Sequence, residues 1–193
     1  MQTLEEYIER ANVAHGHTCA GQILGIRLSL LGLKELGIDD PIKERKRLIT
    51  IVEIDRCATD AVQLVTGCRL GKRALKFKDF GKVAATFMDL KTGRAIRIVA
   101  REESKQKARE LFPELEKEEG QRRAYRQLSD EDLFTRQWVR VVLPEEDMPG
   151  YRAPRVVCAQ CGEGINFKRE VQRDGRLLCR ACAGERYYEP LDG

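Results

Sequence analysis

Long apolar segments are absent from this 193-residue chain, and histidine occurs only twice. No stretch approaches the roughly 20 apolar residues that a transmembrane helix needs. The most apolar segment, 23–33, is short and interrupted by Arg27. The acidic start, residues 1–6, has neither the basic nor the apolar region of a secretory signal. We therefore expect a cytoplasmic protein with no membrane partner.

Strong net charge, internal repeats and common catalytic motifs are also missing. The formal net charge is only +4, so the composition alone gives no reason to expect nucleic-acid binding. Neither a glycine-rich phosphate loop nor a hydrolase triad is evident. The chain has ordinary globular proportions, 42% hydrophobic and 34% charged. Its length allows one medium domain and one small one.

Four of the seven cysteines form a zinc-finger pattern near the C-terminus. In a chain expected in the cytosol, cysteines are typical of metal sites or reactive thiols rather than disulfides. A two-residue gap lets one tight turn present two sulfurs to the same metal, and the pairs Cys158/Cys161 and Cys179/Cys182 both have it. Four unconnected thiols are the alternative. We predict a structural zinc in a treble-clef or zinc-ribbon module over 155–193, preceded by a linker at 144–154.

The charge of this module bears on its partners. Residues 155–193 contain seven Lys or Arg and six Asp or Glu, so the module is almost neutral. Phosphate backbones are bound chiefly by concentrated positive charge. A protein-contact or dimer-stabilising role is therefore favoured. The less favoured alternative is a regulator that binds nucleic acid.

The seven residues from 15 to 21 hold both histidines and a cysteine. Alternate side chains of an extended segment share a face, so His15, His17 and Cys19 can converge. Cys19 precedes a predicted helix, whose N-terminus favours a thiolate. Imidazole and thiolate donors suit zinc, iron, nickel or copper. The alternative is a buried cysteine beside two histidines that are hydrogen-bonded to the backbone.

A third cysteine can complete this centre. Cys57 lies where the predicted strand 48–54 gives way to the predicted helix 57–66, and Asp60 follows on the same helical face. Cys68 stands beyond the other end of that helix, roughly 15 Å away by helical rise, so it is a poor partner for Cys57. We expect His17, Cys19 and Cys57 to bind a metal with a fourth position open to substrate, as in a catalytic site.

The remaining pattern predicts an α+β fold with a mixed or antiparallel sheet, in a core domain of residues 1–143. Two helices are expected within 102–127, divided by Pro113 and Gly120. The basic run 43–47 is expected to be a solvated face. The expected helices are 4–13 and 20–36 besides 57–66, and the expected further strands are 74–77, 83–89, 95–100 and 138–143.

A second group of cations lies between residues 67 and 78, with no acid among them. We expect Lys72 and Arg73 to form a rim for an anionic, carboxylate- or phosphate-bearing cofactor. The alternative is a solvated strand face. The other cations of the run are Arg69, Lys76 and Lys78.

Several of these motifs resemble the E-subunit family of formylmethanofuran dehydrogenase. The resemblance implies a metal site at His17, Cys19 and Cys57, and it places His15, Asp60 and Cys68 nearby, as further ligands or around the ligands. It also implies a dimer, an appended treble-clef finger and a link to the molybdenum or tungsten enzyme that interconverts carbon dioxide and formylmethanofuran in methanogenesis. The matching residues are His15-Gly16-His17-x-Cys19-x-Gly21, Cys57-x-x-Asp60-Ala61-x-Gln63, Thr66-Gly67-Cys68, Leu70-Gly71-Lys72 and Asp79-Phe80-Gly81-Lys82.

Two departures from the family pattern bear on function. Ala20 stands where the family usually has proline, and residues 71–75 read Gly-Lys-Arg-Ala-Leu where it often has Gly-Lys-Gly-Asn-Leu. The second departure concerns the substrate more than the fold. We therefore expect a metal-binding oxidoreductase subunit with zinc, nickel or iron in the core, a homodimer and partner subunits. The alternative is a non-catalytic accessory or scaffold protein whose finger contacts other proteins.

Overall fold

The computed structural model describes residues 2–44 and 46–191, and it divides the chain into two compact units, 1–142 and 143–193. Arg45 of the basic run lies outside the described residues, as do residue 1 of the predicted core and residues 192–193 of the predicted finger. The predicted linker, 144–154, falls within the second unit.

Three helices of the first unit contribute about half of its buried core. Helix α1 (Leu4–His15) begins with a capping box between Thr3 and Glu6, which satisfies two backbone N–H groups. Helix α2 (Ala20–Leu36) is apolar almost all round, and it is correspondingly buried on nearly every side. Helix α3 (Cys57–Thr66) ends at Gly67, which adopts a positive φ of 69°.

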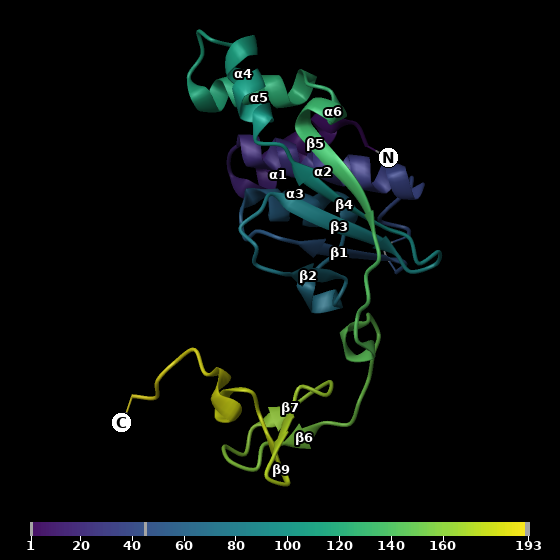
Figure 1. Ribbon diagram of the computed structural model, residues 1–193, viewed down its shortest axis with the longest axis vertical. Coiled ribbons are helices and arrows are strands. Elements are labelled where there is room, and N and C mark those ends of the chain that lie inside the picture. The colour runs from purple at the N-terminus through teal and green to yellow at the C-terminus, as the bar shows by residue number, and fades with distance from the viewer. Residues whose placement is uncertain (1, 45, 192–193) are drawn as a thin grey trace. The chain divides into compact units, whose positions relative to one another are not determined.

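The sheet of the first unit has five strands in the order β2-β1-β3-β4-β5. Strand β1 pairs with β2 in parallel and with β3 antiparallel, while the β3–β4 and β4–β5 pairs are antiparallel. This mixed sheet with packed helices confirms the predicted α+β class (Figure 1). The strands are β1 (Leu48–Val52), β2 (Leu75–Phe77), β3 (Ala84–Asp89), β4 (Ala95–Ala100) and β5 (Phe134–Val139).

Helix α2 packs against β3 and β4, and α3 packs against both α2 and β1. Phe87, Ile96 and Ile98 project from the sheet into this layer and are fully buried. Gly32 of α2 makes room for Phe87, since a Cβ there would lie 2.3 Å from its ring. Helices α2 and α3 therefore have fixed positions on the sheet, and α1 packs against both of them. This matters because the candidate site lies at the ends of the three helices.

The charged region that follows β4 folds into α4 (Glu103–Leu111), α5 (Lys117–Gln127) and α6 (Asp130–Leu133). The chain breaks around Pro113, as predicted, but the predicted break at Gly120 is wrong. Gly120 lies inside α5 and packs against the turn at Phe112, so this glycine serves close packing. Arg27 of α2 holds the region in place by donating to the carbonyl oxygens of Tyr125 and Leu128, both at 2.9 Å.

The last strand of the first unit lies earlier than predicted. The sequence pattern predicts 138–143, whereas β5 covers Phe134–Val139. Its length is set by its partner, because the pairing runs from Ala100 opposite Phe134 to Ala95 opposite Val139, and these two alanines are the last and first residues of β4. The position of β5 therefore depends on its pairing register with β4, which local composition does not reveal.

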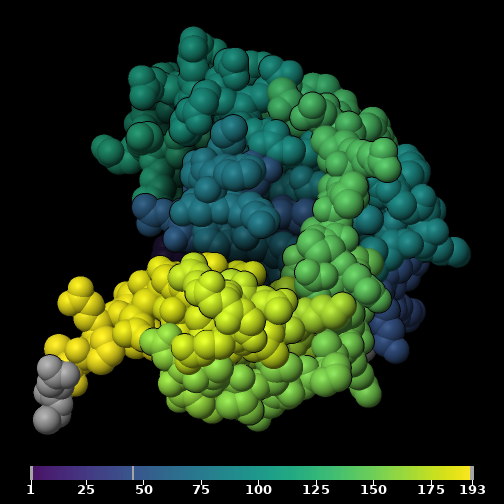
Figure 2. All heavy atoms as spheres, turned by 60° about the horizontal axis from the view of Figure 1, so that its bottom comes forward, coloured from purple at the N-terminus to yellow at the C-terminus, as the bar shows by residue number. Residues whose placement is uncertain are grey.

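The second unit is built from short elements joined by turns. Arg169 forms an ion pair with Asp147, and Lys168 lies over the Tyr151 ring, 5.7 Å from its centre. The chain after the last helical turn extends away from the rest of this unit (Figure 2). The elements are η1 (Leu70–Lys72) in the first unit, and η2 (Glu145–Asp147), β6 (Val156–Val157), β7 (Gly164–Ile165), β8 (Val171–Arg173), β9 (Arg176–Leu178) and η3 (Ala181–Glu185) in the second.

Among the described residues, no helix has the length and apolar character needed to cross a lipid bilayer.

The basic run at 43–47 is not wholly a solvated face. Arg47 donates from Nε and Nη2 to the two carboxylate oxygens of Asp89, at 2.9 and 2.8 Å. Asp89 is fully buried at the end of β3, and it also accepts from the Lys91 N–H and the Thr92 hydroxyl. The Arg47 guanidinium therefore holds the pKa of Asp89 down at about 2.

We expect Asp89→Asn to destabilise the first unit by about 2 kcal/mol at pH 7, since a pKa lowered from 3.8 to about 2 corresponds to that amount. The depressed pKa stabilises the fold above about pH 4, and this contribution is lost as the pH falls towards 2. Urea unfolding followed by the fluorescence of Trp138, the single tryptophan, measures this unit. A difference between variant and wild type that does not shrink below pH 4 would contradict the assignment.

Helices α2 and α3 approach each other unusually closely. A Cβ at Gly25 would lie 2.4 Å from the Ala58 carbonyl oxygen and 2.8 Å from the Ala61 Cβ. We expect Gly25→Ala to destabilise the first unit by roughly 1–3 kcal/mol, because backbone atoms must move apart to admit the methyl group. Gly21→Ala in the same helix is the matched control, since its Cβ would meet only ordinary contacts at 3.7 Å. Equal stabilities of the two variants in urea would refute the close approach.

Candidate metal centre

The histidine segment forms the turn between α1 and α2. Gly16 ends α1 with a positive φ of 85°, which turns the chain so that His15 and His17 face each other. Their ring centres are 4.9 Å apart. One nitrogen of each histidine and the sulfur of Cys19 all lie within 4.8 Å of one another. The three side chains are thus close enough to bind one metal ion.

Cys19 is the N-cap of α2. Its sulfur accepts from the Gln22 N–H at 3.4 Å, while the Gln22 side chain accepts from the Cys19 N–H at 3.2 Å. This is a capping box in which cysteine takes the place usually held by serine or threonine. The N–H group and the helix dipole both favour negative charge on the sulfur, so the position suits a thiolate ligand.

Cys57 is the first residue of α3 and lies beside Cys19. A Cβ at Gly21 would be 3.7 Å from both the Cys19 sulfur and the Cys57 Cβ, so the two cysteines flank this glycine. Burial and the neighbouring Cys19 thiol raise the pKa of Cys57. Two adjacent thiolates repel each other, and a bound cation would offset that repulsion.

Asp60 contacts the centre from the first turn of α3. Its Oδ2 lies 3.5 Å from Nδ1 of His15. A carboxylate at one ring nitrogen orients the imidazole and leaves the other nitrogen for a metal. Asp60, one of the residues predicted to lie around the ligands, thus contacts the centre through the His15 side chain.

Cys68 has a different environment. It is fully buried, donates to the Leu48 carbonyl oxygen at 3.5 Å and lies 3.5 Å from the Thr50 hydroxyl. Burial raises the pKa of this thiol. Cys68 thus packs in the hydrophobic core, on the sheet side of α3.

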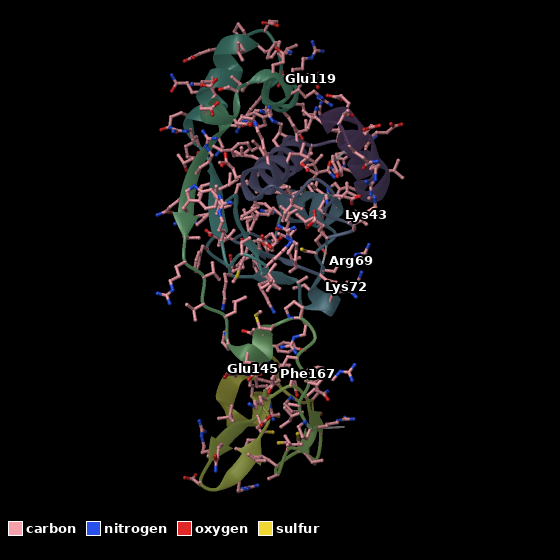
Figure 3. All side chains as sticks on the ribbon, turned by 90° about the vertical axis from the view of Figure 1, so that its right-hand side faces the viewer. Lys43, Arg69, Lys72, Glu119, Glu145 and Phe167 are labelled. Carbon is pink, nitrogen blue, oxygen red and sulfur yellow. The ribbon has the colours of Figure 1, made fainter. Side chains whose placement is uncertain are left out.

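The predicted cation rim has several environments. Lys72 and Arg69 are exposed at the same edge of the first unit (Figure 3), whereas Arg73 is half-buried with a positive φ of 57°. Arg69 lines a cavity that His15, Gln22 and Asp60 also line. The sequence analysis includes Arg69 in the cation run but does not identify a role for Gln22, although a glutamine three residues after a capping cysteine is a signal that could have been used.

The donors at the core centre fit a transition metal. Two imidazole nitrogens and one or two thiolates are borderline-to-soft ligands, which zinc, iron and nickel accept. They converge from the end of one helix and the starts of two others, so the fold itself brings them together. The structure thus contains a candidate metal centre at His15, His17 and Cys19, with Cys57 adjacent.

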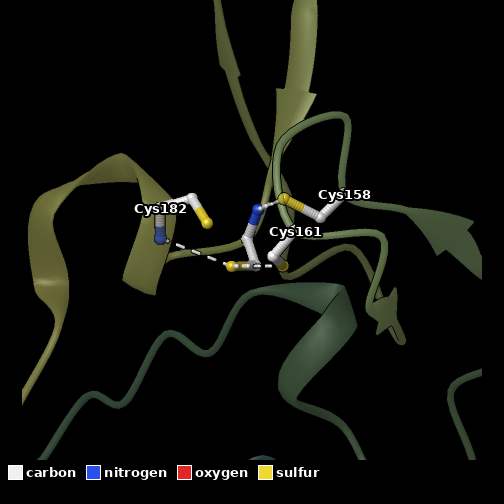
Figure 4. A group of neighbouring side chains, drawn as sticks. Cys158, Cys161 and Cys182 are labelled. Atoms are coloured by element: carbon white, nitrogen blue, oxygen red, sulfur yellow. Dashed lines mark hydrogen bonds between the residues drawn. The ribbon is translucent and has the colours of Figure 1, made fainter. Parts of the chain in front are cut away.

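The four cysteines of the second unit form another group. One sulfur from each lies within 4.8 Å of the other three. The Cys161 and Cys179 sulfurs are 3.8 Å apart, and backbone N–H groups of Cys179 and Cys182 point at the sulfurs of Cys158 and Cys179 (Figure 4). The N–H groups of Cys161, Cys179 and Gln160 lower the pKa of Cys158 to about 6. Four thiolates in one group fit a structural zinc with no open position.

Comparisons with known proteins match both units. The family model described as "FmdE, Molybdenum formylmethanofuran dehydrogenase operon" matches residues 14–143. The model described as "Prokaryotic dksA/traR C4-type zinc finger" matches residues 151–188, which confirms the predicted finger.

One curated relative and one solved structure extend these matches. A protein of Archaeoglobus fulgidus named "Probable S-adenosyl-L-methionine-binding protein" is 32% identical over 203 residues, covering 95% of this chain and 54% of that protein. The chain thus spans about half the length of this relative. A protein from Syntrophus aciditrophicus that is like the E-subunit (FmdE) of tungsten formylmethanofuran dehydrogenase has a TM-score of 0.68 and 26% identity, and the match covers 97% of this chain and 96% of that one.

We expect Cys158→Ser to lose the finger's zinc and to unfold the second unit, because so small a module cannot bury enough apolar surface alone. Among the described residues of this unit, the apolar cluster is built on three buried ones, Cys158, Ile165 and Leu178. Trp138 fluorescence should be unchanged, since that residue belongs to the first unit. Trypsin should then cleave the unfolded second unit at its arginines, which are frequent beyond residue 143. Resistance equal to that of the wild type would contradict a zinc-dependent fold.

Proposed function

This chain belongs to the FmdE family, and from that premise we propose that its core centre binds a transition metal that takes part in ligand binding or catalysis. The observation that carries the proposal is the convergence of His15, His17 and Cys19 to within 4.8 Å. The finger adds a structural zinc and holds no open position. The chain is then a two-site metalloprotein in which only the core site can act on a substrate.

In this proposal His15, His17 and Cys19 are the metal ligands. The sequence-based expectation leaves His15 either as a further ligand or as a residue around the ligands. Its contact with Asp60 favours the first, because a carboxylate at Nδ1 leaves Nε2 for the metal. Cys57 lies next to Cys19 but outside the group of donor atoms that are within 4.8 Å of one another. In this proposal it is a weaker fourth donor, which an incoming ligand can displace.

A metal bound at these residues would supply Lewis-acid or electron-transfer chemistry. The chain's own residues define where a substrate meets it. Asp60 orients the His15 ring, and the start of α2 stabilises charge on the Cys19 sulfur. Zinc, nickel and iron all suit this donor set, and we propose one of these three.

The proposed setting is one-carbon redox metabolism, as an oxidoreductase subunit related to the enzyme that interconverts carbon dioxide and formylmethanofuran. The family's description and the name of the solved relative support this setting. In this setting we propose that the chain is a cytoplasmic homodimer and associates with partner subunits of a molybdenum or tungsten enzyme, as in methanogenesis. S-adenosylmethionine binding is not part of the proposal, since the shared stretch is about half of the relative that bears that name.

An accessory role is the second candidate, and the exposed end of the finger favours it. Tyr187 is 95% exposed and Leu191 is 93% exposed, beyond the last helical turn. Exposed apolar and aromatic side chains are typical of protein-contact surfaces. In this alternative the core metal stabilises the fold and its coordination shell is closed by all four donors.

The metal content of single-cysteine variants tests the proposal. We expect Cys19→Ser to lose the core metal and retain the finger's zinc, because it removes a sulfur ligand without touching the second unit. Cys68→Ala is the matched control, since this thiol is buried away from the centre. Elemental analysis of the purified proteins should show about one metal equivalent fewer for Cys19→Ser than for the control.

Two outcomes would count against the proposal. Full metal content in Cys19→Ser would show that the core is not a metal site. If the core metal is present but added imidazole leaves the visible spectrum of a Co²⁺-loaded core unchanged, the shell is closed and the accessory role is favoured.

A further inference from the structure

A cavity of about 420 Å³ lies beside the core centre. His15 lines it from the end of α1 and Gln22 from the first turn of α2, while α3 supplies a row of side chains including Asp60 and Leu64. This volume is within the range of small-molecule sites. Because His15 is a proposed metal ligand, the cavity borders the proposed metal centre through this side chain.

The two ends of the cavity differ in charge. Asp60 is in the first turn of α3 and Arg69 follows its last turn, so they are separated by roughly 10 Å of helical rise. Asp60 is engaged with His15. Arg69 is exposed and forms no ion pair within residues 2–44 and 46–191. The cavity therefore has a metal centre near one end and an uncompensated cation near the other.

The middle of the cavity combines apolar surface with two amides. Ala11, Ala61 and Leu64 provide the apolar part. The Gln22 side chain is only 2% exposed and is fixed by the Cys19 N–H and the Ala11 carbonyl. Gln63 of α3 contributes the second amide side chain to the lining. Such a lining suits a short, mainly apolar spacer rather than a sugar or a peptide.

A second cavity of about 400 Å³ shares His15 and Asp60 with the first. It is lined also by Asp55, Arg56 and Cys57. The His15–Asp60 pair thus lies between the two cavities. A ligand can approach the centre from the cavity lined by Arg69, while Cys57 lines the second cavity.

We infer that the cavity binds a small organic anion, with its carboxylate or phosphate on Arg69, an apolar spacer over Ala61 and Leu64, and a nitrogen or sulfur donor that reaches the core metal. This inference rests on the proposed function, because the donor end needs the metal. It assigns the anion contact to Arg69, not to Lys72 or Arg73, because Arg69 is the member of that run that lines the cavity.

The test uses the full chain with zinc in the finger and Co²⁺ in the core. The probe is 3-(imidazol-4-yl)propanoate, which carries a nitrogen donor and a carboxylate, and the neutral comparison is the corresponding alcohol. We expect the carboxylate to bind about tenfold more tightly than the alcohol, as one charge-assisted hydrogen bond at a partly exposed site provides. Both should shift the visible spectrum of the Co²⁺.

Arg69→Gln should reduce the preference for the carboxylate to about twofold or less, while leaving binding of the alcohol unchanged. Lys72→Gln is the matched control, because it removes the same charge from a neighbouring exposed position outside the cavity, and it should keep the full preference. Calorimetry gives the dissociation constants, and the spectrum reports whether the donor reaches the metal.

The outcomes separate the two proposals. A core that takes up no Co²⁺ contradicts the proposed metal site itself. A core that binds Co²⁺ but shows no preference for the carboxylate, or keeps the preference in Arg69→Gln, overturns the assignment of Arg69. Binding that depends on Arg69 without any spectral change overturns the inference that the ligand spans from the arginine to the metal.

Discussion

The close approach of α2 and α3 at Gly25 is the constraint on which the core centre depends. Gly21 lies against Cys57 and Ala58, and Gly25 lies against Ala58 and Ala61, so the two helices run side by side in the same direction. Their N-termini are therefore together. Cys19 caps one helix and Cys57 begins the other, which places the two sulfurs at the same end of the pair.

The sheet fixes this pair rather than forming the site. Phe87, Ile96 and Ile98 anchor α2, and the Arg47–Asp89 pair closes the buried end of β3. The segment with both histidines then only has to connect α1 to α2, and Gly16 provides the turn. The core centre is thus assembled on a scaffold with its own hydrophobic core. The finger, with three buried residues in its apolar cluster, needs its metal to fold.

Much of this could be predicted from the sequence because the signals are local. Helix α2 and the cysteine pairs of the finger follow from apolar periodicity and ligand spacing. The convergence of His15, His17 and Cys19 is also predicted, but from an extended segment, whereas the structure achieves it through the end of α1 and the turn at Gly16. The position of β5 could not be predicted, because it is set by pairing with β4. The contact of Asp60 with His15 and the cavity beside Arg69 depend on how α1 packs against α3, which no single segment encodes.

X-ray absorption at the edge of the core metal, identified by elemental analysis, in a Cys158→Ser variant whose finger is expected to lose its zinc tests the central claim most directly. Our account predicts two nitrogen neighbours from His15 and His17 at about 2.0–2.1 Å, together with sulfur from Cys19 and Cys57 at about 2.3 Å. A shell of oxygen and nitrogen without sulfur, or of sulfur alone, would contradict it, because either result would mean that the imidazoles and thiolates do not meet at one metal.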